Sequence, residues 1–113
     1  MKPEHKKILN DNHFEPHGTV ATALKSDEFD NCRVLYAISD PDGQEIVYVG
    51  DTEVGRDVRA RLKAHMNARD KAGHVELGSS VWVHFMVTEF KVLCDFETET
   101  GGLPRLNKRK VAK

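Results

Sequence analysis

Residues 33–50 read RVLYAISDPDGQEIVYVG, and this stretch decides the fold. Two short apolar runs enclose the sequence DPDG at positions 40–43. Proline presets one backbone angle of a turn and glycine tolerates positive φ, so the pattern predicts an antiparallel β-hairpin with strands over 33–39 and 45–50. Each strand carries one tyrosine, Tyr36 or Tyr48. Tyrosine packs well on a half-buried sheet, so the two rings either serve only the core or share a further purpose.

After the hairpin, the hydrophobic spacing changes from that of a strand to that of a helix. In DTEVGRDVRARLKAHMNARDKAG, positions 51–73, Val58, Leu62 and Met66 recur at helical intervals. They predict an amphipathic helix that Gly73 can end.

The next two segments complete the predicted domain. SSVWVHFMVTEF at 79–90 alternates with a period of two and has few polar positions, so it predicts a third strand that is covered on both faces. KVLCDFETET at 91–100 predicts a short helix, which Gly101 and Gly102 end. The order β-β-α-β-α predicts an α+β domain with a three-stranded antiparallel sheet flanked by helices.

Composition divides the chain into three parts. Residues 1–32 mix histidine, proline, asparagine and charge, with one helical candidate, TVATALKSDEF, at 19–29, and they predict a lead-in or cap. The domain itself is expected over 33–107, and a basic tail over 108–113. With 113 residues, of which 39% are hydrophobic and 31% charged, we expect one small domain with a thin core.

Membrane attachment and disulfide bonding are not expected. No apolar run approaches the roughly 20 residues that a membrane span needs. The start of the chain, MKPEHKKILNDNHFEPHG, lacks the apolar segment of a signal peptide, so we expect a cytoplasmic protein. Cys32 and Cys94 have no CxxC or zinc-type spacing and are expected to be reduced thiols.

Charge is unevenly distributed although the net charge is only −1. The last nine residues, RLNKRKVAK, contain five of the 17 lysines and arginines and no acid, so the rest of the chain is acidic. A basic tail on an acidic body is either a solvated end or a contact for a polyanion such as DNA. The candidate nucleic-acid contacts are Arg105, Lys108, Arg109 and Lys110.

Four kinds of side chain gather around this framework. Besides the two tyrosines, Arg61 and His65 lie one turn apart on the rim of the predicted helix, and several acids precede Asn107 near the end of the chain. A guanidinium holds phosphate oxygens, a carboxylate carries a divalent cation, and a hydroxyl or an imidazole takes a proton from attacking water. Metal-assisted phosphodiester cleavage uses this set of groups.

The order of these residues resembles that of the GIY-YIG endonuclease superfamily. VLYAI at 34–38 is similar to the first signature, with valine and leucine where the family has glycine and isoleucine. VYVG at 47–50 is similar to the second signature. RLKAH at 61–65 has the family's R-x-x-x-H form, and PRLN at 104–107 matches its P-x-x-N segment.

The resemblance implies a metal-dependent endonuclease that hydrolyses DNA by a one-metal mechanism. Within the superfamily, the chain resembles the compact stand-alone members found among phage, mobile-element and restriction-type proteins. Tyr36, assisted by His65, would be the general base, and Tyr48 would hydrogen-bond the scissile phosphate. Arg61 would bind the phosphate, Glu97 would hold Mg²⁺ (or Mn²⁺), and Asn107 would support the site.

Two assignments within the resemblance have alternatives. Arg56 or Arg59 could take the arginine position, but only Arg61 places a histidine four residues later. For the metal-binding carboxylate, Glu97 is preferred to Glu99, and Glu99 to Asp95. Positions 97 and 99 are about 200° apart on a helix, so at most one of them can face the site.

Two other functions compete with the nuclease. One is a non-catalytic module of the same fold that binds nucleic acid or protein, which suits the acids that crowd the hairpin turn and the loop after Gly50. The other is an unrelated α/β adaptor in which the tyrosines only pack, and it predicts that Arg61 and His65 point to solvent. A nuclease domain of this size offers little surface for reading bases, so specificity would need the tail, residues 1–32, a dimer or a protein partner.

Overall fold

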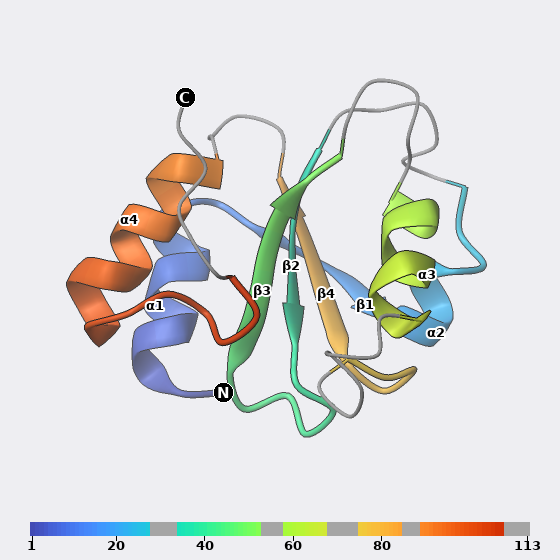
Figure 1. Ribbon diagram of the computed structural model, residues 1–113, viewed down its shortest axis with the longest axis horizontal. Coiled ribbons are helices and arrows are strands. Elements are labelled where there is room, and N and C mark those ends of the chain that lie inside the picture. Colours follow the sequence, from blue (N-terminus) through green and yellow to red (C-terminus); the bar gives the residue numbers. More distant parts are fainter. Residues whose placement is uncertain (28–33, 53–57, 68–74, 85–88, 108–113) are drawn as a thin grey trace.

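The computed structural model describes residues 1–27, 34–52, 58–67, 75–84 and 89–107. The chain forms a small α+β domain with a four-stranded antiparallel sheet in the order β1-β4-β2-β3 (Figure 1). Its elements are α1 (Pro3–Asp11), β1 (Glu15–Thr19), α2 (Val20–Ala23), β2 (Leu35–Ser39), β3 (Ile46–Asp51), α3 (Val58–Asn67), β4 (Ser80–His84) and α4 (Glu89–Thr100).

The predicted hairpin is confirmed as β2 and β3. The two strands pair antiparallel, with Tyr36 opposite Gly50 and Ile38 opposite Tyr48. In the turn, the carboxylate of Asp40 accepts the backbone N–H of Gln44 at 2.8 Å, and Gly43 has φ 71°. The positive φ of Gly43 is the conformation that the glycine of DPDG was expected to supply.

The third predicted strand, β4, lies inside the sheet between β1 and β2. Val81 and Val83 point into the hydrophobic cluster on one face, while Trp82 packs against the cluster on the other. The expectation of a strand covered on both faces is therefore confirmed. The end of the predicted strand, 85–88, lies outside the described residues, and Glu89 already belongs to α4.

The sheet has one more strand than the three expected. β1, with the sequence EPHGT, pairs antiparallel with β4, and a register irregularity lies between Pro16 and Thr19. Its residues are exposed or half-buried and none is buried, so the sequence of the strand lacks the alternation of apolar residues that marks the other strands. Proline and glycine are tolerated on such an edge and disguise the strand in the sequence.

The helix expected over 19–29 is shorter than predicted. α2 spans four residues, and the side chain of Thr19 caps its start by accepting the N–H of Thr22 at 3.3 Å. Residues 28–33 lie outside the described residues. Gly18, just before this cap, has φ 78°.

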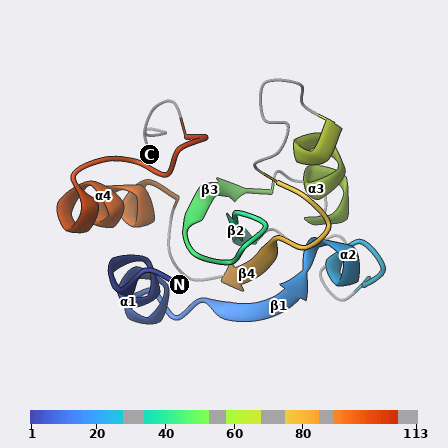
Figure 2. The ribbon, with the colours of Figure 1, turned by 90° about the horizontal axis from the view of Figure 1, so that it is seen from below.

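Helices cover both faces of the sheet. Figure 2 shows α2 and α3 on one side, and α1 and α4 on the other. The first side is packed around a cluster that includes Val20, Ala23, Val34, Tyr36, Ile38, Leu62 and Val83. The second is packed around Ile8, Leu9, Phe14, Leu35, Ala37, Val49, Leu93 and Phe96. Residues 1–27 thus contribute to both halves of the core, more than a lead-in would.

The helices of the described residues are short. The longest, α4, has 12 residues, and none is long and apolar enough to cross a membrane. α4 also carries Cys94, whose thiol is free and half-buried. Cys32 lies outside the described residues. Gly101, with φ 83°, follows α4 and donates its N–H to the carbonyl of Glu97, so it ends the helix as predicted.

Candidate active site

The two tyrosines lie on the face of the sheet that α3 covers. Their ring centroids are 6.0 Å apart, with 37° between the ring planes. Gly50 lies beside both rings, because it is opposite Tyr36 and two residues beyond Tyr48 on the same strand. A Cβ placed at Gly50 would lie 2.5 Å from Tyr48 Cε2 and 2.8 Å from the Tyr36 hydroxyl oxygen. The rings can approach this closely only because position 50 has no side chain.

Helix α3 brings Arg61 and His65 to the same place. Val58 and Leu62 bury one side of the helix against the sheet, and Arg61 and His65 flank that side. Arg61 Nε donates to the Tyr36 hydroxyl oxygen at 3.2 Å, and His65 Nε2 lies 2.8 Å from the same oxygen. The imidazole also packs against Tyr48, with ring centroids 4.2 Å apart. The Tyr36 hydroxyl is the point where the cluster converges.

We call Tyr36, Tyr48, Arg61 and His65 the tyrosine cluster. It has an inner and an outer layer, since Tyr36 is 0% exposed and His65 5%, whereas Tyr48 and Arg61 are half-buried. The outer pair is therefore available to a ligand, and the inner pair lies behind it.

The electrostatics of Arg61 reflect this setting. Burial lowers the pKa of Arg61, but its interactions with the Tyr36 and Tyr48 side chains, which include a hydrogen bond to each, raise the pKa by more. The net pKa lies above its ordinary value. Arg61 is therefore a permanent cation that lies against two phenol hydroxyls.

The structure distinguishes among some of the sequence-based alternatives. The adaptor hypothesis predicted Arg61 and His65 to point to solvent, far from both hydroxyls, and that prediction is wrong because both side chains contact Tyr36. Arg59 lies two residues before Arg61, about 200° away around the helix. Arg56 lies outside the described residues.

Asn107 was expected to support the site. In the structure its side chain bonds to the backbone of β3. Its Oδ1 accepts the N–H of Val49 and its Nδ2 donates to the carbonyl of Val49, both at 2.9 Å. Leu106 adds a backbone bond to the carbonyl of Val47 at 2.8 Å. The two residues that flank Tyr48 are thus held by the C-terminal segment.

Replacing Asn107 by alanine is expected to destabilise the fold, because the side chain is buried and satisfies two backbone groups. A buried group left without a partner costs about 1–3 kcal/mol, so we expect a loss of about 2–4 kcal/mol in the free energy of unfolding. Urea denaturation measures it. Asn10→Ala, at an exposed position on α1, is the matched control, and equal stability of the two variants would contradict the role of Asn107.

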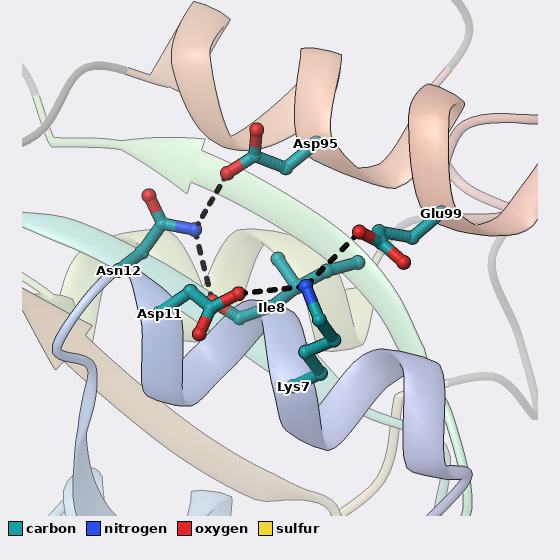
Figure 3. A network of polar contacts seen from close by, with 6 residues as sticks. All are labelled: Lys7, Ile8, Asp11, Asn12, Asp95 and Glu99. Carbon is teal, nitrogen blue, oxygen red and sulfur yellow. Dashed lines mark hydrogen bonds and ion pairs between the residues drawn. The ribbon is translucent and has the colours of Figure 1, made fainter.

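The three candidate metal-binding acids are not brought to the tyrosine cluster. They lie on α4, which packs against the opposite face of the sheet. Asp95 accepts Asn12 Nδ2 at 2.9 Å, and Glu99 forms an ion pair with Lys7 at 3.1 Å (Figure 3). Glu97 is exposed. Two of the three carboxylates thus join α4 to α1.

Glu89 is an acid that the sequence-based assignment did not consider. The segment 79–90 was expected to be one strand, and this hid the fact that a helix begins at Glu89. Figure 1 shows α4 starting near the end of the sheet where β2 begins and β3 ends. Tyr36 and Gly50 lie one residue from that end of their strands. Among the acids of α4, Glu89 is therefore nearest along the helix to the end of the sheet that carries the cluster.

Two further expectations concern ligands. Within the described ranges, no group of three or more His, Cys, Asp and Glu side chains is arranged to hold a metal ion. Mg²⁺ in proteins often takes only one or two carboxylates and completes its shell with water and phosphate oxygens.

Of the candidate nucleic-acid contacts, Arg105 forms an ion pair with Glu45 at 2.9 Å. Lys108, Arg109 and Lys110 lie outside the described residues.

Comparisons with protein-family models, with curated proteins and with solved structures found no match. The function has to be inferred from the chain's own residues. The tyrosine cluster is the place where reactive groups converge in the described structure.

Proposed function

We propose that this protein is a metal-dependent endonuclease of the GIY-YIG type that hydrolyses phosphodiester bonds in DNA. One observation carries the proposal: the hydroxyl of Tyr36 is shared by a guanidinium and an imidazole, behind the half-buried Tyr48. A tyrosine pair that only packs in the core needs neither a cation nor a histidine at its hydroxyl. A phosphodiester site needs a cation for the phosphate and a group that accepts a proton.

Arg61 is the phosphate-binding residue in this proposal. It lies in the outer layer of the cluster and carries a permanent charge. Its guanidinium has five N–H donors, of which the Nε–H is used by Tyr36, so donors remain for phosphate oxygens. Half-burial strengthens its attraction to the charge that develops on the phosphate.

Tyr36 and His65 form the proton-accepting pair. With Arg61 donating to its oxygen, Tyr36 donates its own proton to Nε2 of a neutral His65. Transfer of that proton leaves a phenolate, which Arg61 stabilises, and the phenolate takes the proton of attacking water. Because Tyr36 is 0% exposed, the attacking water has to reach its hydroxyl from the side of the half-buried Tyr48 and Arg61.

Tyr48 orients the substrate. Its ring packs against the rings of His65 and Tyr36, and its neighbours Val47 and Val49 are bonded to the C-terminal segment. A hydroxyl fixed in this way can donate a hydrogen bond to a phosphate oxygen beside Arg61. The hairpin turn with Asp40 and Asp42 lies at the other end of β2 and β3, so these acids do not face the bound phosphate.

A divalent cation, Mg²⁺ or Mn²⁺, is part of the proposal and would polarise the phosphate. The segment of α4 that carries Asp95, Glu97 and Glu99 packs against the far face of the sheet, and Asp95 and Glu99 bond to Asn12 and Lys7. We therefore propose Glu89 as the metal ligand, because α4 begins near the end of the sheet where β2 begins and β3 ends.

Glu89→Gln is expected to abolish metal-dependent cleavage, whereas Glu97→Gln is expected to leave it within about twofold of the wild type. The two variants remove one charge each from the same helix and serve as controls for each other. The measurement is the cleavage rate of labelled duplex DNA as a function of Mn²⁺ concentration. Loss of cleavage in Glu97→Gln alone would restore Glu97 as the ligand and contradict the revised assignment.

A non-catalytic nucleic-acid-binding module is the second candidate, and the placement of Asp95, Glu97 and Glu99 away from the tyrosine cluster favours it. It predicts that DNA binds equally well in Mg²⁺ and in EDTA and is never cut. Arg61→Ala would then weaken binding without changing any cleavage rate. Fluorescence polarisation with a labelled duplex, followed by electrophoresis of the same sample, separates the two functions.

A further inference from the structure

Strand β3 is at the edge of the sheet, yet its outer side is bonded to both ends of the described chain. Near the start of the strand, the N–H of Ile46 donates to His5 Nδ1 at 2.8 Å. Farther along, Leu106 and Asn107 bond to Val47 and Val49. An edge strand ordinarily leaves these groups to water. Within the described residues, the side chains of His5 and Asn107 and the backbone N–H of Leu106 bond to this edge in place of a neighbour strand.

Glu45 ties the same two ends together. Its two carboxylate oxygens lie 2.8 Å from Lys2 Nζ and 2.9 Å from Arg105 Nε. The backbone N–H of Lys2 also donates to the carbonyl of Gln44 at 2.7 Å. The start of β3 is therefore the junction between α1, the hairpin and the C-terminal segment.

His5 is the titratable member of this junction. It is 9% exposed, and its ring packs in an edge-to-face arrangement with Phe96 of α4, with centroids 5.3 Å apart and 79° between the ring planes. A backbone N–H can only donate, so Nδ1 must carry a lone pair and the imidazole must be neutral. Protonation of Nδ1 would set two N–H groups against each other and break the bond to Ile46.

The charged groups around His5 come from several elements. Lys2 and Glu4 belong to the N-terminal segment, and Asp40 and Glu45 to the hairpin. α4 presents the apolar ring of Phe96, and Arg105 is engaged by Glu45. Burial lowers the pKa of His5, and the nearby carboxylate of Glu45 offsets part of this effect.

We propose that His5 is a positioning residue that makes the strand carrying Tyr48 sensitive to acid. As a neutral imidazole it fixes the start of β3 to α1. As an imidazolium it releases that strand end, which lies two residues from Tyr48. The link to cleavage rests on the proposed nuclease function, whereas the link to the strand does not.

The sign follows from the direction of the pKa shift. His5 has a lower pKa in the folded chain than the ordinary 6.5, so the unfolded chain binds more protons between the two values. The contribution of His5 to the stability of the folded chain is complete above pH 6.5. It is lost as the pH falls from 6.5 toward the pKa of His5 in the folded chain. At the same time the bond to Ile46 is lost in a growing fraction of folded molecules.

The test uses the full chain and two variants. His5→Asn places an amide oxygen near the position of Nδ1, so it keeps an acceptor that does not titrate, and His5→Leu removes the acceptor. Hydrogen exchange followed by NMR gives the protection factors of the Ile46 and Val49 amides from pH 8 to 5. In the wild type we expect Ile46 protection to fall at least tenfold and Val49 protection to fall in parallel. We expect no such pH dependence in His5→Asn and low Ile46 protection at every pH in His5→Leu.

Equal pH dependence of Ile46 protection in the wild type and His5→Asn would overturn the proposal. So would a loss at Ile46 that leaves Val49 unaffected, since the effect would then not reach the residues beside Tyr48. Cleavage adds a second readout: the rate should fall more steeply with acid in the wild type than in His5→Asn. If neither protein cuts DNA at any pH, the nuclease function fails, and the amide measurement alone decides on His5.

Discussion

Arg61→Ala is expected to slow DNA cleavage by about 10²–10³-fold, the usual effect of removing one preorganised group that stabilises transition-state charge. The reason lies in the geometry: Arg61 is the cation that bonds the Tyr36 hydroxyl, and it is half-buried beside Tyr48. Its loss removes both the phosphate contact and the charge that stabilises a Tyr36 phenolate. Single-turnover rates on labelled duplex DNA, with thermal unfolding as a check of folding, measure the effect.

Lys63→Ala is the matched control for Arg61→Ala. Lys63 is an exposed cation on the same helix, two residues away, so the variant removes the same charge without touching the cluster. We expect its cleavage rate to stay within about twofold of the wild type, because an exposed charge is screened by salt. Equal losses in both variants would mean that α3 contributes only general electrostatic attraction for DNA.

Gly50→Ala is expected to lower both stability and activity. The added Cβ would approach Tyr48 Cε2 to 2.5 Å and the Tyr36 hydroxyl to 2.8 Å, which is closer than Cβ atoms come to other heavy atoms. One or both rings must shift, and overpacking of this kind costs about 1–3 kcal/mol. Because Tyr36 and Tyr48 carry the site, we expect cleavage to fall at least tenfold even at temperatures where the variant is folded.

Gly102→Ala controls for the loss of a glycine as such. A Cβ at Gly102 would have no heavy atom within 4 Å, so we expect unchanged activity and a stability equal to or slightly above that of the wild type. Urea denaturation and the cleavage assay measure both variants. A Gly50→Ala protein that is as stable and as active as Gly102→Ala would show that the rings do not need their present positions.

The hairpin and the rim of α3 could be predicted because local chemistry decides them. A proline and a glycine in DPDG fix the turn, and the register then sets Tyr36 opposite Gly50. The spacing of Val58 and Leu62 decides which side of α3 is buried, and this places Arg61 and His65 at its rim. These features depend on residues close in sequence, so periodicity suffices to find them.

Other features depend on contacts between distant residues and leave little trace in the sequence. β1 is a strand only because β4 offers it an edge, and its proline and glycine do not suggest one. His5 belongs to the segment that was expected to be a lead-in or cap, but it is buried and bonded to Ile46, 41 positions away. The sequence could not show which acid of α4 faces the site, because contacts with distant residues decide which face of the helix packs against the sheet. That face sets Asp95 and Glu99 against α1.

The most direct test of the central claim is the cleavage of labelled single- and double-stranded DNA and RNA by the wild type and by Tyr36→Phe, in Mg²⁺, Mn²⁺ or EDTA. Phenylalanine keeps the buried ring and removes only the hydroxyl that Arg61 and His65 share. We predict that the wild type cuts DNA with either metal and not in EDTA, and that folded Tyr36→Phe is at least about 100-fold slower, within the usual range for a general base. Full cleavage by Tyr36→Phe, or no cleavage of any substrate by the folded wild type, would contradict the assignment of this cluster as a nuclease site.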